Sequence, residues 1–182
     1  MIFTRMVREH KEVKYVQLYL KPEGGPDLMF SVFDRNGKGA CEVFGKIAPI
    51  GSFFVLRMSD GKTVARMKGV CLPSSIRYSA ACGSRKIRFQ VRPTAISHRS
   101  VRFKGVRWRF RGNLITRSFD ILDDEKMNPA KTIMTHGRCW NCQRECYAIT
   151  IPEEKDVPLA LCVAVAIDST VMSDFTFPVP AG

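Results

Sequence analysis

The sequence has no apolar segment long enough to cross a bilayer as a helix. Its longest uninterrupted apolar run, Val157–Ile167, has eleven residues, whereas a membrane-spanning helix needs about 20. The first fifteen residues, MIFTRMVREHKEVKY, are charged throughout and lack an apolar core, so we expect no secretory signal. The cysteine count is seven, and an odd number without a signal favours free thiols in a reducing compartment. We therefore expect a cytoplasmic protein without a transmembrane span, and peripheral attachment to a membrane stays open.

The common catalytic motifs are also missing. The three histidines are His10, His98 and His136, and there is no Gly-x-Ser-x-Gly, Gly-x-x-x-x-Gly-Lys or His-Glu-x-x-His pattern. The acidic cluster Asp123–Glu125 falls at an expected hairpin connection, where solvated turn residues are more common than an acid–base pair. We predict a protein that is not an enzyme and needs no cofactor. An active site assembled from distant residues is the alternative.

Acidic residues are missing from the centre of the chain. Between Gly61 and Phe119 there is no Asp or Glu, while Lys and Arg occur fifteen times; the whole chain has a net charge of +12. A field of one sign attracts polyanions such as nucleic acid, an anionic membrane or a phosphorylated ligand. The alternative is a basic surface that is merely solvated.

The cations of this region follow the periodicity of β-strands. In KIRFQVR (86–92), VRFK (101–104) and VRWRFR (106–111), basic or polar residues alternate with apolar ones, so they are expected to occupy opposite faces of a strand. A shift of phase at Gly105–Val106 predicts a bulge or tight turn. The candidate anion-binding or lipid-binding residues are Lys86, Arg88, Arg92, Arg102, Lys104, Arg107, Arg109 and Arg111.

The sequence predicts antiparallel hairpins over most of the chain. Alternating arms flank turns in 30–45, 53–70 and 76–93, and a longer connection joins the arms of 119–135, which favours a sandwich or barrel. A weak sequence similarity between residues 30–34 and 119–123 is consistent with two meander-like halves. The apolar run 157–167 follows Asp156, a good N-cap, and has Pro158 in its first turn. We expect a helix that is buried on all sides and fills the barrel; a buried strand is the alternative.

These stretches resemble the Tubby C-terminal-like superfamily, and in particular the LURP-one-related proteins, with phospholipid scramblases as distant relatives. The resemblance lies in FSVFDRNGKGACEVFGK, MSDGKTVARMKG, RWRFRGNLITRSFDILDDE and CYAITIPEEKDVPLALCVAVAID, which together cover most of Phe30–Asp168. It implies a mainly β fold, an antiparallel closed barrel of about twelve strands around one buried apolar C-terminal helix. One domain is expected over 1–182, with the helix at about 157–168 and a tail at 169–182.

The family resemblance implies a class of ligand and does not assign a binding residue. Tubby itself binds phosphoinositides at a basic surface, and scramblases are linked to membranes. No family binding motif aligns residue by residue with this sequence. The longer C-terminal membrane-anchoring segment of scramblases has no counterpart in STVMSDFTFPVPAG, which follows Asp168, so we do not expect lipid scrambling.

A cluster of cysteines provides a candidate metal site. His136, Cys139, Cys142 and Cys146 lie within eleven residues, and three thiolates with one imidazole can bind zinc. On a strand, however, positions three apart face opposite ways. We therefore favour free thiols and no metal, with zinc as the alternative.

The expected function is binding of an anionic lipid or phosphoinositide head group by the basic strands. Single-stranded nucleic acid ranks lower because the aromatic residues that would stack on bases are expected to face inward, away from the cations. These are Phe89, Phe103, Trp108 and Phe110. Binding of a protein scaffold by the same surface is a further alternative, with no partner identified.

Overall fold

The fold is a closed antiparallel β-barrel. The computed structural model describes residues 15–48, 50–93, 100–123, 131–139 and 146–172. Within that part of the chain each strand pairs with the next, and the first pairs with the last to close the barrel. The strands are β1 (Val16–Pro22), β2 (Leu28–Asp34), β3 (Gly39–Ala48), β4 (Gly51–Met58), β5 (Thr63–Leu72), β6 (Ser75–Cys82), β7 (Arg85–Val91), β8 (Val101–Lys104), β9 (Trp108–Asn113), β10 (Ser118–Asp123), β11 (Lys131–Arg138) and β12 (Tyr147–Ile151).

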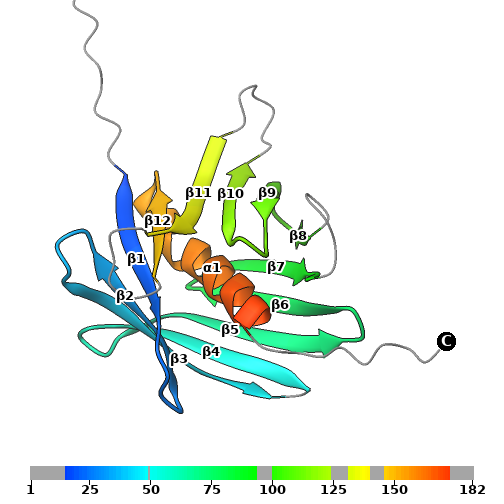
Figure 1. Ribbon diagram of the computed structural model, residues 1–182, viewed down its shortest axis with the longest axis horizontal. Helices are drawn as coiled ribbons and strands as arrows, with labels where there is room; N and C mark the ends of the chain where they lie inside the picture. Colours follow the sequence, from blue (N-terminus) through cyan, green and yellow to red (C-terminus); the bar gives the residue numbers. More distant parts are fainter. Residues whose placement is uncertain (1–14, 49, 94–99, 124–130, 140–145, 173–182) are drawn as a thin grey trace, which may run out of the picture.

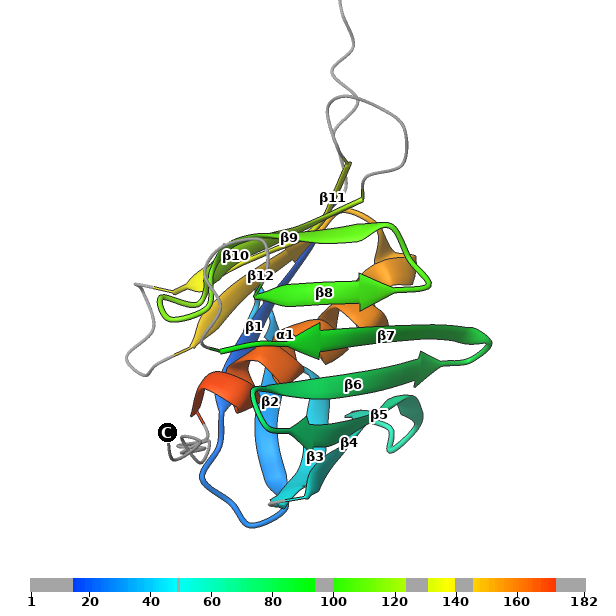
Figure 2. The ribbon, with the colours of Figure 1, turned by 90° about the vertical axis from the view of Figure 1, so that its right-hand side faces the viewer.

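One helix occupies the interior of this barrel. A 3₁₀ turn, η2 (Glu154–Asp156), leads directly into α1 (Val157–Met172), and the strands surround the helix in the ribbon (Figure 1; Figure 2). Every residue of 162–168 is fully buried. The fold expected from the sequence is confirmed, and the helix extends one turn beyond the expected boundary at residue 168 because Ser169 and Thr170 are buried as well. Within the described residues, no helix is long and apolar enough to cross a membrane.

The hairpins form at the turns that the sequence indicates. After β2, the carboxylate of Asp34 accepts hydrogen bonds from the main-chain N–H groups of Asn36 and Lys38 at 2.8 and 2.9 Å. The Asp60 carboxylate accepts one from the N–H of Lys62 at 2.9 Å before β5. These carboxylates stabilise the turns by occupying main-chain donors that the ladders leave unpaired. The shift of phase at Gly105–Val106 is a turn between β8 and β9.

Gly112 allows β9 and β10 to approach each other closely. Its φ is +137°, and a Cβ atom there would lie 2.6 Å from Cα of Phe119 and would overlap the main-chain oxygen of Ser118. A residue with a side chain would be strained in this conformation and would push the two strands apart. The glycine in the stretch RWRFRG is therefore required for a steric reason.

A charge inside the helix tests this architecture. Ala164 is 0% exposed, so Ala164→Asp would bury a carboxylate without a partner. An unpaired buried charge costs about 3–5 kcal/mol, a large share of a total stability of about 5–15 kcal/mol. We expect Ala164→Asp to unfold or aggregate, as followed by circular dichroism. Ile115→Asp, at an exposed turn position, should melt like the wild type. A folded Ala164→Asp variant with an unchanged melting temperature would show that the helix is not enclosed.

Candidate anion-binding surface

The candidate cations lie on three neighbouring strands of the barrel wall. Lys86 and Arg88 are on β7, Arg102 and Lys104 on β8, and Arg109 and Arg111 on β9; all six are exposed. Two candidates lie outside the strands. Arg107 is exposed in the turn before β9, and Arg92 is half-buried after the end of β7, with Nη2 3.5 Å from Oε1 of Gln90.

The strand register places cations directly opposite one another. Arg88 on β7 is the cross-strand partner of Lys104 on β8, and Arg102 on β8 is the partner of Arg109 on β9. The outward position of each of these residues follows from the inward burial of its neighbours Ile87, Phe89, Val101 and Phe110. The structure therefore brings four of the candidates into two opposed pairs.

Arg111 has an acidic partner on the next strand. Its Nη2 donates to Oδ2 of Asp120 at 2.7 Å, and its Nε donates to the same oxygen at 3.2 Å. Asp120 is the cross-strand neighbour of Arg111 on β10. The Asp120 carboxylate therefore offsets the charge of Arg111.

Three further cations continue this surface on strands that the sequence analysis did not include. Arg66 and Lys68 are exposed on β5, and Arg77 is exposed on β6. Ser79 on β6 pairs with both Lys68 and Arg88, so Lys68, Ser79, Arg88 and Lys104 form one row across four strands. Alternation of basic and apolar residues in VARMKGV (64–70) could have identified the first two. We define the basic face as Arg66, Lys68, Arg77, Lys86, Arg88, Arg102, Lys104 and Arg109.

The aromatic residues of this region pack beneath the basic face. Phe89 and Phe110 are buried, while Phe103 and Trp108 are half-buried and pack against the core. The ring centroids of Phe89 and Phe103 are 5.6 Å apart, and those of Phe103 and Trp108 are 5.8 Å apart. These aromatic rings support the strands from inside, as the alternation indicated, and leave the outer surface to the cations.

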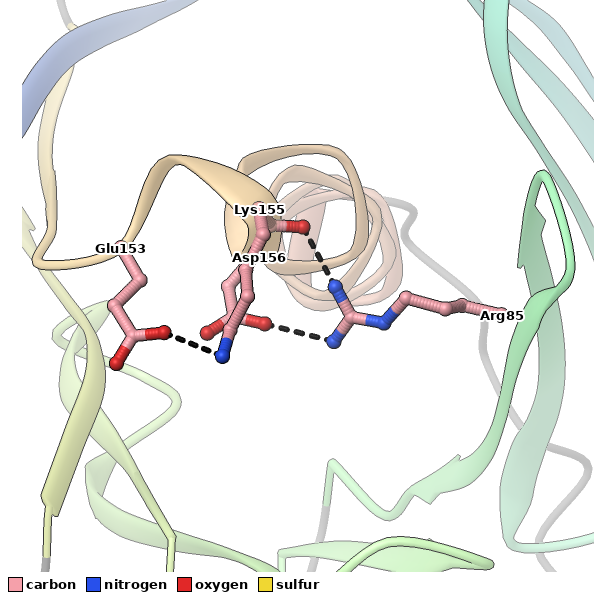
Figure 3. Close-up of polar contacts among 4 residues, drawn as sticks. All are labelled: Arg85, Glu153, Lys155 and Asp156. Carbon is pink, nitrogen blue, oxygen red and sulfur yellow. Dashed lines mark hydrogen bonds and ion pairs between the residues drawn. The ribbon is translucent and has the colours of Figure 1, made fainter.

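Arg85 has a structural contact that separates it from the basic face. Its Nη2 donates to Oδ1 of Asp156 at 2.7 Å, and its Nη1 donates to the main-chain oxygen of Lys155 at 2.6 Å (Figure 3). The Asp156 side chain is 5% exposed, and that of Arg85 is 43% exposed. Asp156, expected to cap the helix, therefore ties the start of α1 to the start of β7. The neighbouring Lys155–Glu153 pair, at 2.6 Å, is more exposed and contributes little to stability.

His136 belongs to a buried network at the other end of the helix. Its Nδ1 donates to the main-chain oxygen of Arg117 at 2.7 Å, and its Nε2 lies 3.1 Å from Oδ2 of Asp168. The imidazole stacks between the rings of Phe119 and Tyr147, with centroid distances of 4.4 and 4.9 Å. The network links β11 to α1. In the sequence, only the carboxylate of Asp168, directly after the apolar run, pointed to it.

The candidate zinc ligands are only partly described. Both ring nitrogens of His136 face polar atoms of the network, and the main-chain N–H of Cys139 donates to the oxygen of Cys146 at 3.0 Å. Cys142 lies outside the described residues. Among the residues that the structure does describe, no group of three or more His, Cys, Asp or Glu is placed to hold a metal ion.

An apolar pocket of about 350 Å³ opens beside the first turn of α1. Leu18, Val32 and Cys41 line it from the strands, and Val157 and Leu161 line it from the helix. Burial, with a smaller contribution from the Glu42 carboxylate, raises the pKa of Cys41 to about 12. Burial also raises the pKa of Cys162 inside the barrel. Both thiols are therefore held in the unreactive protonated form.

A closed barrel built around an apolar helix is the architecture that the resemblance implied. Residues 21–168 match the LURP-one-related family, and the chain belongs to that family. It is 21% identical over 145 residues to the uncharacterized protein YxjI of Bacillus subtilis (strain 168), covering 80% of this chain and 86% of that one. An X-ray structure of a protein from Arabidopsis thaliana is similar in fold, with a TM-score of 0.53, 13% identity and coverage of 86% of this chain and 91% of that one.

The contact between Arg85 and Asp156 can be tested by removing one partner and then both. Arg85→Gln should lower the free energy of unfolding by about 1–3 kcal/mol, because it leaves a buried carboxylate without its donor. Arg85→Gln with Asp156→Asn should recover part of this loss in urea denaturation. Arg88→Gln is the matched control and should not destabilise the protein. Equal stability of Arg85→Gln and wild type would mean that the contact does not hold the helix.

The buried thiols lead to a prediction about alkylation. At a pKa of about 12, about one Cys41 thiol in 10,000 is ionised at pH 8. Iodoacetamide at that pH should modify the half-buried Cys71 well before Cys41 or Cys162, as followed by peptide mass spectrometry. Alkylation of all three at similar rates in urea is the control. Equal rates for Cys41 and Cys71 in the folded protein would contradict the burial of Cys41.

Proposed function

We propose that this protein is a non-enzymatic binding module for anionic ligands, and that its ligands are the phosphate head groups of acidic lipids. The opposed pair Arg88–Lys104, with Arg102 beside Lys104 on β8, carries this proposal. Like charges directly opposite each other destabilise a sheet by about 0.2–1 kcal/mol. Departures from such local rules of stability are expected at functional or strained sites. A bound phosphate would remove the repulsion.

Membership of the LURP-one-related family supports the coarser part of this proposal, a binding module of unknown specificity. The sequence resemblance to Tubby-like proteins supports the finer part, because Tubby itself binds phosphoinositides. The basic face is carried on strands rather than on loops, so binding needs ordering of its side chains but not of its backbone. We propose a cytoplasmic protein that attaches peripherally to anionic membranes.

The alternative function is binding of single-stranded nucleic acid or of an acidic protein scaffold by the same basic face. A stacking platform needs aromatic rings among the cations. Phe89, Phe103, Trp108 and Phe110 are instead buried or half-buried beneath the strands. This arrangement favours the lipid phosphates over nucleic acid.

The proposal predicts the effect of removing three opposed cations. Arg88→Gln, Arg102→Gln and Lys104→Gln together should weaken binding to phosphatidylserine vesicles more than a hundredfold. Each basic residue near an acidic membrane contributes about 1 kcal/mol, and about 3 kcal/mol corresponds to that factor. The triple variant should be at least as stable as wild type, because the like-charge pair Arg88–Lys104 is relieved. Vesicle co-sedimentation and thermal melting measure the two effects.

The matched control removes the same charge elsewhere. Arg35, Lys38 and Lys62 are exposed in the β2–β3 and β4–β5 turns, and changing all three to Gln should reduce vesicle binding much less. Wild-type binding should weaken as salt rises, since the attraction decays within a Debye length of about 8–10 Å. Equal losses of vesicle binding in the two triple variants would show that the basic face acts only through the net charge of the protein. Binding of single-stranded RNA by the wild type, with no binding to vesicles, would replace the proposal with its alternative.

A further inference from the structure

Large apolar side chains are exposed at one corner of the barrel wall. Ile50 is 87% exposed, Val70 54% and Phe53 41%. Val70 on β5 is the cross-strand partner of Gly51 on β4, the residue that follows Ile50. Phe53 lies on β4, two residues further along the strand. These three residues, which we call the apolar corner, are therefore neighbours on the outside of β4 and β5.

The apolar corner is continuous with the basic face. Phe53 pairs with Lys68, the first cation of the row that runs through Ser79 and Arg88 to Lys104. Val70 pairs with Arg77, and that row continues through Gln90 and Arg102 to Arg109. On the other side of Phe53, its partner on β3 is the exposed Lys46. Each of the two cationic rows thus reaches an exposed apolar residue, which is Phe53 in one row and Val70 in the other.

The chemistry of this corner identifies the kind of partner. A soluble anion would need the cations and would gain nothing from Ile50, Phe53 and Val70. Nucleic-acid bases stack on aromatic rings, and two of the three residues are aliphatic. An acidic bilayer has phosphates at its surface and acyl chains about 5–10 Å deeper, where apolar groups next to basic ones are buried. Lysines that flank an apolar residue can extend their ammonium groups towards the head groups.

We infer that the partner of this surface is a lipid bilayer, with the apolar corner inserted at the boundary between head groups and acyl chains and the basic face on the phosphates, an inference that rests on the anion binding proposed above. Ile50 lies in the turn between β3 and β4, at an end of the barrel wall, and can enter the membrane first. The strands fix the distance between the inserting residues and the cations. The barrel therefore attaches to the membrane in one orientation.

The first experiment separates insertion from anion binding. Ile50→Ser, Phe53→Ser and Val70→Thr are combined in one variant, and its control combines Tyr15→Ser, Met58→Ser and Ile115→Ser, exposed apolar residues outside the corner. Binding is measured to vesicles of phosphatidylcholine with roughly one-third phosphatidylserine, and to soluble inositol hexakisphosphate. We expect the corner variant to bind vesicles at least about tenfold more weakly and inositol hexakisphosphate unchanged. The control should match wild type on both ligands.

The second experiment detects insertion directly and requires only a conservative change. Phe53→Trp should be quenched by lipids with brominated acyl chains well beyond the quenching of the wild-type tryptophans, while Ile115→Trp should add none. This quenching measurement still tests insertion if the corner variant does not fold.

The outcomes distinguish this inference from the function on which it rests. Unchanged vesicle binding by the corner variant, or no added quenching of Phe53→Trp, would overturn insertion. Wild-type binding of inositol hexakisphosphate without binding to vesicles would overturn the bilayer partner and leave anion binding in place. If wild type binds neither, the proposed function fails too. Loss of single-stranded RNA binding in the corner variant, with no vesicle binding by wild type, would assign the surface to nucleic acid.

Discussion

The burial of α1 over residues 159–170 is the constraint on which the rest of this structure depends. A helix with no polar face over residues 157–167 must be covered on every side, and a single flat sheet can cover only one. Closing the strands into a barrel covers all sides and leaves no unpaired edge. The polar contacts lie where the apolar run stops, with Arg85 at Asp156 on one end and His136 at Asp168 on the other. These two carboxylates join the helix to β7 and β11 without placing a charge in its middle.

The same constraint determines what lies on the outside. Successive side chains of a strand point to opposite faces, so a register that turns Ile87 and Phe89 towards the helix must turn Lys86 and Arg88 outward. A slip of one residue would bury the cations against the apolar core, which is far too costly to occur. The core therefore positions the basic face, and the opposed cations cannot move apart by rearranging the backbone. The surface keeps its charge density whether or not a ligand is bound.

The face of a strand on which a residue lies can be predicted from the sequence more readily than its partner on the neighbouring strand. Alternation and turns between the arms predicted the hairpins, and the apolar run after Asp156 predicted the enclosed helix, because these are local patterns. Local patterns do not contain the cross-strand register, so the pairing of Arg88 with Lys104 and of Arg111 with Asp120 could not be foreseen. Arg85 was indistinguishable from its basic neighbours until the helix start was placed beside it. Phe53 and Val70 were read as parts of one hairpin, and only the closed wall shows that they adjoin the cations of β5 and β6.

Charge and apolar contact act over different distances, and together they would favour one orientation of the barrel on a membrane. Attraction between the basic face and an anionic membrane extends over about a Debye length, about 8 Å at physiological salt, and by itself would tolerate many orientations. Burial of Ile50, Phe53 and Val70 requires direct contact and is insensitive to salt. Because the apolar corner lies at one end of the cationic rows, both contributions are satisfied only when the β4–β9 wall lies against the membrane. If the proposed partner is a membrane, electrostatic attraction would bring the barrel to its surface, and the apolar corner would select the orientation in which it remains there.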